Sequence, residues 1–204
     1  MFEGLESRRL FALTVVGDGP LLTITGTAAS ETAEIWVTPD DGDTDDRPEI
    51  EVNGIDYSFV NNVAIEGILA NMGGGVDTVV LHTAISDGSV DVVINGEEGN
   101  DDLTLFAEPG STEFTLTGGV DNDTFHLSRG GGIVEGGSDD DTYYYSSDAN
   151  GYSMDMTDFQ GSNTIIIGGV DRTSAIGGNH LTGSVGRNSN GDYFWDGADG
   201  LQVF

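Results

Sequence analysis

The sequence of 204 residues contains no cysteine and no lysine, and its basic residues are all arginine. Without cysteine, disulfide bonds and thiolate chemistry are excluded. Six arginines against 36 acidic residues give a net charge of −30, which argues against nucleic acid and anionic lipid as partners because both require a basic surface. The longest apolar run near the start, Leu10 to Val16, is too short to span a bilayer. The classes that remain to balance this negative charge are metal cations, cationic ligands and the ions of a salty medium.

The acidic residues are mainly aspartate, and glycine supplies another 32 residues. Aspartate suits tight turns and the ligation of hard cations better than helix surfaces. Because 37% of the residues are hydrophobic, the chain can still bury a core despite its charge. We therefore expect one folded domain of ordinary size.

A repeat runs through the middle of the chain. Five segments share a leading polar residue and an alternation of polar and apolar positions, at spacings of 24, 22, 18 and 22 residues. The segments begin at Asp77, Asp101, Asp123, Asp141 and Asn163. Each follows a glycine-rich or acidic loop, and a second alternating stretch lies between successive segments.

Alternation with a period of two, bounded by Gly and Asp, predicts strands rather than helices. Two short strands and two turns per repeat predict an all-β fold, a parallel β-roll or β-solenoid of about five to seven coils capped at both ends. Stacked coils would form two inward columns, Val79, Leu103, Phe125, Tyr143 and Ile165 beside Leu81, Leu105, Leu127, Tyr145 and Ile167. An antiparallel sandwich would give similar local patterns, but the recurrence of the polar residue at one phase favours the solenoid.

Stacking in register would place the four aspartates in a column about 4.8 Å apart, the spacing of neighbouring strands. Like charges at that distance repel by about 3.5 kcal/mol at the effective dielectric constant of a protein surface. A divalent cation between successive loops would reverse this effect, and glycine allows the loop carbonyl oxygens to turn inward as further ligands. Oxygen ligands without cysteine favour Ca²⁺ over Zn²⁺, and Mg²⁺ requires stricter octahedral geometry.

These loops resemble the RTX, or haemolysin-type, calcium-binding repeat G-G-x-G-x-D-x-U-x. Residues 96–103 match with Glu97 for the second glycine, and residues 118–125 and 136–143 match with Asp121 and Asp139 for the third. Met72 replaces the first glycine in the loop before Asp77, and Asn163 replaces the aspartate in the last copy. The resemblance implies a β-roll that folds on calcium in an extracellular, calcium-rich medium.

The family usually repeats its motif back to back, whereas the second corner of each coil here is an ordinary turn. We therefore expect a single column of about three to four Ca²⁺ ions. The candidate ligands, including backbone oxygens, are Asp77, Asp101, Asp123, Asp141, Asn163, Gly75, Gly99, Asn100, Asp121, Asn122, Asp139 and Asp140. A solvated loop charge is the plain alternative for Asp121, Asp139 and Asp140.

The regions outside the repeat divide into three parts. Residues 1–16 form an expected lead-in and cap, in which Leu5, Glu6, Arg8 and Leu10 resemble the LEPR-x-LL motif near the start of surface and secreted proteins of planctomycete-type bacteria. Residues 17–70 are expected to be degenerate edge coils, with Glu31 at the aspartate position and a solvated acidic loop at 40–46. Residues 71–167 are the calcium-binding repeats, and residues 168–204 are expected to cap the last coil.

The combined expectation is a non-enzymatic, secreted or surface-displayed protein in which calcium is structural, acting in a matrix, in adhesion or in a surface layer. Cell-surface polysaccharide or another copy of the chain are the expected partners, without nucleic acid or membrane insertion. The alternatives are a β-helical polysaccharide lyase, disfavoured by the lack of lysine and the shortage of arginine near the coils, and a module that serves only secretion and folding.

Overall fold

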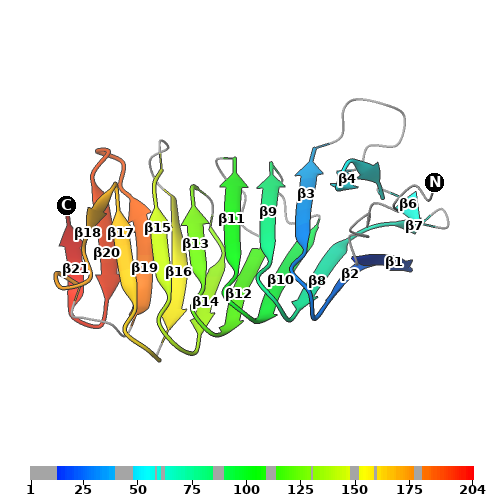
Figure 1. Cartoon of the computed structure of the whole chain (residues 1–204). Coiled ribbons are helices and arrows are strands. Elements are labelled where there is room, and N and C mark those ends of the chain that lie inside the picture. Colours follow the sequence, from blue (N-terminus) through cyan, green and yellow to red (C-terminus); the bar gives the residue numbers. More distant parts are fainter. Residues whose placement is uncertain are drawn as a thin grey trace, which may run out of the picture.

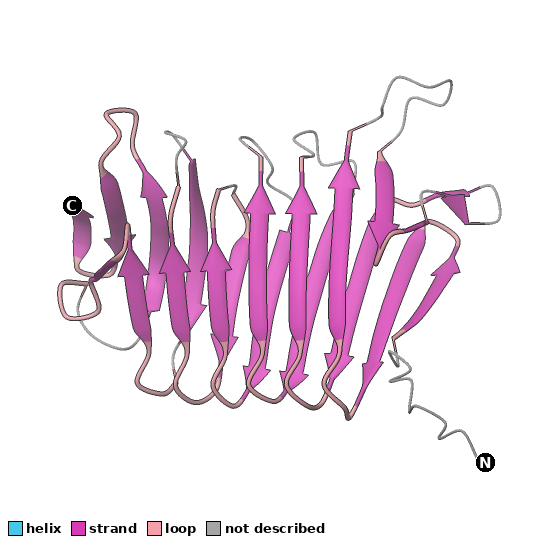
Figure 2. Cartoon of the chain, turned by 45° about the horizontal axis from the view of Figure 1, so that its top comes forward, coloured by secondary structure: helices cyan, strands magenta, loops and turns pink. Residues whose placement is uncertain are grey.

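In a computed structural model, residues 13–39, 48–57, 59–60, 63–84, 90–108, 114–129, 131–147, 152–158, 160–176 and 181–204 are described, and these residues contain no helix. They form two long sheets that face each other (Figures 1 and 2). Sheet one comprises, in spatial order, β1 (Thr14–Asp18), β2 (Leu21–Thr27), β8 (Gly67–Gly73), β10 (Asp91–Glu98), β12 (Phe114–Val120), β14 (Ile133–Gly137), β16 (Tyr152–Asp158), β19 (Leu181–Arg187), β20 (Tyr193–Gly197) and β21 (Gly200–Val203).

Sheet two comprises β18 (Val170–Asp171), β17 (Thr164–Ile167), β15 (Thr142–Tyr145), β13 (Thr124–Leu127), β11 (Asp102–Ala107), β9 (Thr78–Thr83), β3 (Thr32–Thr38), β4 (Glu49–Val52) and β5 (Ile55–Asp56). The short strands β6 (Phe59–Val60) and β7 (Val63–Ala64) pair only with each other among the described strands.

The chain alternates between the two sheets, which makes it a parallel β-solenoid and confirms the expected fold class. Strands β2, β8, β10, β12, β14 and β16 pair in parallel in sheet one, and β3, β9, β11, β13, β15 and β17 do so in sheet two. From β8 to β16 the path makes about four uninterrupted turns, slightly fewer than expected. The first coil, β2 and β3, stacks in parallel on β8 and β9 but is separated from them in the chain by the antiparallel strands β4 to β7, and antiparallel strands also follow the last coil, β16 and β17.

The core fills the space between the two sheets. The sequence alternates because every second side chain of a strand points to this interior. Both predicted columns, from Val79 to Ile165 and from Leu81 to Ile167, are buried, with at most 3% of any side chain exposed. The rings of Phe125 and Tyr143 stack with their centroids 4.8 Å apart. Burial of each large apolar side chain contributes roughly 1.5–3 kcal/mol, so each coil is stabilised through its neighbours rather than alone.

The N-terminal region is only partly the set of edge coils that we expected. Strands β2 and β3 form one coil in register with β8 and β9, with Ile35 and Val37 buried. Strands β4, β5, β6 and β7 instead pair antiparallel, and β1 lies antiparallel on β2. These antiparallel strands cover the first coil. The LEPR-like motif and the acidic loop at 40–46 lie outside the described residues.

The C-terminal region departs from the repeat. Strand β18 pairs antiparallel with β17, while β19, β20 and β21 extend sheet one as antiparallel strands. Trp195 is buried, and Tyr193 and Phe204 pack against the core. Nowhere in the described part of the chain is there a helix that could cross a membrane.

Candidate metal site at the aspartate corner

The tight corners that lead from sheet one to sheet two lie along one edge of the solenoid (Figure 2). We number the residues of each corner from one to six, so that position six is the leading polar residue of the sheet-two strand. The six corners are residues 26–31, 72–77, 96–101, 118–123, 136–141 and 158–163.

Positions two and four have positive φ angles in each of the four corners that carry an aspartate. The glycines at these positions have φ angles between 92° and 127°, a region that side chains rarely allow. Glu97 at position two, and Asp121 and Asp139 at position four, have φ angles of 77° to 79°. The glycines of the motif are therefore explained by backbone conformation, and these three acidic residues occupy a strained one.

The polar residues at position six form a continuous hydrogen-bonded column, which we call the inner ladder. The backbone N–H of each member donates to Oδ1 of the next, from Glu31 to Asp77 (2.6 Å), Asp77 to Asp101 (2.8 Å), Asp101 to Asp123 (2.8 Å), Asp123 to Asp141 (2.8 Å) and Asp141 to Asn163 (2.9 Å). The four aspartates are at most 2% exposed. The structure thus brings together the five leading residues that the sequence identified.

The second carboxylate oxygen of each aspartate has no protein partner. Oδ2 of Asp77, Asp101, Asp123 and Asp141 is buried without a hydrogen bond. At the corners of Asp101 and Asp123 this oxygen points toward the position-one glycine, because a Cβ on Gly96 or Gly118 would overlap it. Buried polar atoms are normally satisfied, so four orphaned oxygens in one column indicate a missing positive charge or proton.

Burial makes the ionised form of these carboxylates unfavourable. Desolvation is the main cause that raises the pKa from 3.8 to about 6 for Asp77 and Asp101, to about 7 for Asp123 and to about 8 for Asp141. The backbone N–H bonds of the ladder oppose this rise, while neighbouring acidic groups add to it. Without a cation, the column binds protons near neutral pH.

Asn163 shows how a neutral residue satisfies the same position. Its Oδ1 accepts the ladder bond from Asp141, and its Nδ2 donates to the carbonyl oxygen of Gln160, at 2.6 Å. Gln160 occupies position three of its corner. An aspartate in place of Asn163 would present an oxygen to this carbonyl, and two acceptors cannot bond without a proton or a cation between them.

Asp158 belongs to the C-terminal end of the column, although we did not identify it from the sequence. It is 2% exposed, and its Oδ2 accepts a hydrogen bond from the hydroxyl of Tyr143, at 2.6 Å. A Cβ on Gly136 would overlap oxygens of Asp158, Asp141 and Tyr143, so these groups converge there. Counting five residues back from Asn163 would have placed Asp158 at position one.

The N-terminal end of the column is different. Glu31 stands at the aspartate position as predicted, but its carboxylate turns back to accept bonds from the N–H and hydroxyl of Thr27. In the next corner the buried side chain of Met72 occupies position one, where the following corners have glycine. Among the six corners, only those of Asp101, Asp123 and Asp141 therefore combine glycine at position one with aspartate at position six.

The remaining candidate side chains lie on the outside of the corners, and they do not join the inner ladder. Asn100, Asn122 and Asp140 form an outer ladder, in which the N–H of Asn122 donates to Asn100 (3.1 Å) and that of Asp140 donates to Asn122 (2.8 Å). Asp121 and Asp139 are exposed. At Gly75 and Gly99 the two loops pack backbone against backbone. Because glycine has no side chain, these two residues offer a metal ion only their carbonyl oxygens.

The candidate ligand atoms are all oxygens, and they fit a hard cation that binds backbone carbonyl oxygens as well as carboxylates. Among the described residues, no three side chains of His, Cys, Asp or Glu gather closely enough to hold a metal ion by themselves. A cation at the inner ladder would therefore bind aspartate Oδ2 atoms together with loop carbonyl oxygens. Such mixed oxygen coordination is typical of Ca²⁺ and does not suit Zn²⁺.

The chain matches no family model, no curated protein and no solved structure.

Proposed function

We propose that this protein is an extracellular, non-enzymatic calcium-binding β-roll in which Ca²⁺ is structural and required for folding. The observation that supports this most directly is the column of four buried aspartates whose Oδ2 atoms lack partners. Each would supply a charged oxygen ligand between two successive corners, and about three to four ions would fill the column.

Protonation is the competing explanation for the orphaned oxygens. A proton would satisfy each carboxyl group below its raised pKa, but at the mildly alkaline pH of many external waters the groups with pKa values of about 6 would ionise. Calcium is abundant outside cells, and its charge offsets the repulsion between neighbouring carboxylates at any pH above their pKa. Under those conditions a bound cation, rather than a proton, would have to offset the charge of these carboxylates.

We propose Asp101, Asp123 and Asp141 as the principal ligands, because each of their corners has glycine at position one, next to Oδ2 of the aspartate. Asp158 adds a further carboxylate beside Asp141. At the other end, Met72 leaves Asp77 with a less polar surrounding, so we expect the ion nearest Asp77 to bind most weakly.

The absence of enzymatic activity is also part of the proposal. A lyase would require a basic residue to remove a proton, and Arg129, which lies beside the coils, instead forms an ion pair with Glu108 at 3.2 Å. We propose a role on the cell surface, in a matrix or in adhesion.

Adjacent aspartates provide a matched test. Asp101 is buried in the inner ladder, whereas the next residue, Asp102, has a side chain that is 47% exposed. We expect the metal-free protein at about pH 8 to be largely unfolded by circular dichroism and to gain β-structure with millimolar Ca²⁺. Asp101→Asn should weaken the affinity of the folded protein for Ca²⁺ at least about tenfold, whereas Asp102→Asn should leave it within about twofold.

Isothermal titration of the wild type and both variants should show fewer bound ions only for Asp101→Asn. Identical spectra in chelator and in calcium would contradict the folding requirement. Equal effects of the two substitutions would contradict the assignment of the inner ladder as the binding site.

A further inference from the structure

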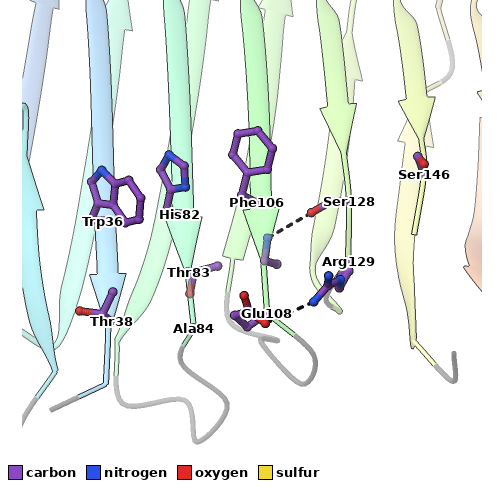
Figure 3. Close-up of a pocket in the computed structure, with 11 residues that line it drawn as sticks. Trp36, Thr38, His82, Thr83, Ala84, Phe106, Glu108, Ser128, Arg129 and Ser146 are labelled. Carbon is purple, nitrogen blue, oxygen red and sulfur yellow. Dashed lines mark hydrogen bonds and ion pairs between the residues drawn. The ribbon is translucent and has the colours of Figure 1, made fainter. Parts of the chain in front are cut away.

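The outer face of sheet two carries a row of stacked rings, far from the aspartate corner. Trp36, His82 and Phe106 lie on neighbouring strands (Figure 3), with ring centroids 3.6 Å apart for Trp36 and His82 and 5.0 Å apart for His82 and Phe106. Trp36 is 38% exposed and Phe106 is 52% exposed. His82 lies five residues after Asp77, which places the rings roughly 16 Å along the strands from the inner ladder.

The row of rings ends abruptly at two serines. Extending the pairing of β11, β13 and β15 by one residue places Ser128 beside Phe106 and Ser146 beside Ser128. A second stack, His126 on Tyr144 with centroids 4.9 Å apart, stands one row away on the same face. The two serines therefore leave a gap that is bordered by Phe106 and by the second stack.

This gap belongs to a hollow whose two portions share the lining residues Phe106, Ser128 and Ser146. One portion has a volume of about 490 Å³ and includes Thr104, Phe106, His126, Ser128, Tyr144 and Ser146. An adjoining portion of about 450 Å³ extends from Trp36 to Ser146 and includes Glu108 and Arg129. Both volumes lie within the range of small-ligand sites, roughly 300–1,000 Å³. Five neighbouring strands, from β3 to β15, span about 19 Å, which is longer than one sugar ring.

The chemistry of the hollow combines flat apolar surfaces with hydroxyl and charged groups. The Phe106 ring and the stack of His126 and Tyr144 offer surfaces for the apolar faces of a pyranose ring. Hydroxyl groups of Thr104 and Ser146, together with the Glu108–Arg129 pair, offer donors and acceptors for sugar hydroxyls. The net charge of −30 disfavours polyanions such as polyuronates.

We propose that this hollow on sheet two binds a neutral pyranose oligosaccharide, with Phe106 as the main stacking residue and Ser146 as the residue that keeps the gap open. The inference refines the proposed adhesion role and relies on calcium only for folding, since the hollow contains none of the inner-ladder aspartates.

Two substitutions test the hollow in opposite ways. Phe106→Ala removes a stacking surface, whereas Ser146→Phe fills the gap by continuing the row of rings and keeps the backbone bond from Ser146 N–H to the Leu127 carbonyl. Ile133→Ala is the matched control, because Ile133 is an exposed apolar residue, 44% exposed, on the outer face of sheet one. All proteins are assayed in calcium after circular dichroism has shown that they are folded.

The probes are cello-, xylo- and manno-oligosaccharides, with a polyuronate oligosaccharide and a proline-rich peptide as comparisons. Binding is measured by isothermal titration and by fluorescence of Trp36, since Trp195 is buried. We expect at least one neutral oligosaccharide to bind, with a loss of at least about tenfold in affinity for Phe106→Ala and Ser146→Phe and less than about twofold for Ile133→Ala.

Failure of every neutral oligosaccharide to bind the folded wild type would overturn the proposal, as would binding of only the polyuronate or the peptide. Binding that survives both Phe106→Ala and Ser146→Phe would also overturn it. A protein that is folded without calcium and binds sugar would contradict the calcium proposal and leave the sugar site standing. A protein that needs calcium to fold and binds no sugar would contradict only the sugar site, so the two failures are distinguishable.

Discussion

Acid is expected to replace calcium in folding this protein. The inner-ladder aspartates have pKa values raised to about 6, 6, 7 and 8 in the folded chain, so the folded state holds protons that the unfolded state releases. For carboxyl groups with raised pKa values, the stabilisation is complete below about pH 4 and is lost as the pH rises through about 6 to 8. The metal-free protein should therefore be more stable in acid, which is the reverse of most acid denaturation.

The magnitude follows from the buried carboxyl groups. For Asp123, the difference between a pKa of about 7 and the ordinary 3.8 corresponds to about 4 kcal/mol of unfavourable free energy when the group is ionised. The four groups influence one another, so their free energies do not simply add, but a cost of this size at even one or two of them is a large part of the stability of a typical domain, about 5–15 kcal/mol. The metal-free fold should therefore fail at alkaline pH, where all four groups are ionised.

The assay is urea unfolding between about pH 5 and pH 8.5, in metal-free buffer and in millimolar calcium. In metal-free buffer the free energy of unfolding should fall with rising pH, and in calcium it should rise because protons compete with the ion for the same oxygens. Asp123→Asn should stabilise the metal-free protein by about 2–4 kcal/mol at pH 8.5, have a smaller effect at pH 5, and destabilise the calcium-bound form.

Asp102→Asn is the control for general loss of negative charge, since its side chain is half-exposed, and it should not change the pH dependence. A metal-free protein that is equally stable at both ends of the pH range would refute the reasoning. So would an Asp123→Asn variant that keeps the pH slope of the wild type.

Two further predictions concern the corners. Gly118→Ala should lower the free energy of unfolding in calcium by about 3 kcal/mol, seen as a lower midpoint of thermal unfolding, because the new Cβ overlaps Oδ2 of Asp123. Gly67→Ala should have no such effect, because its Cβ would come no closer than 3.4 Å to the neighbouring atoms. Glu97→Gly should stabilise the fold by about 1 kcal/mol in denaturant titrations, since Glu97 has a φ angle of 78°. Glu98→Gly, at a position without a positive φ angle, should destabilise it, and the opposite order would show that the corner is not strained at Glu97.

The sequence by itself determined the winding of the middle of the chain. A polar residue that recurs at one phase, followed by period-two alternation, can bury its apolar side chains only if neighbouring coils stack in register. For this reason the two inward columns and the five leading residues of the corners could be identified before the structure. The glycines of the motif were also readable, and positive φ angles at positions two and four favour them, although acidic residues occupy three of these positions.

The tertiary structure alone decided which oxygens face inward. Asp121, Asp139 and Asp140 have the same chemistry as Asp123 in the sequence, but the corner turns them to the outside, while Asp158 arrives from the end of β16 beside Asp141. The antiparallel pairing of strands β4 to β7 could not be predicted from the sequence either, because alternation predicts a strand and not the direction of its partner. The hollow on sheet two likewise depends on register across five strands, and no single segment of sequence contains that information.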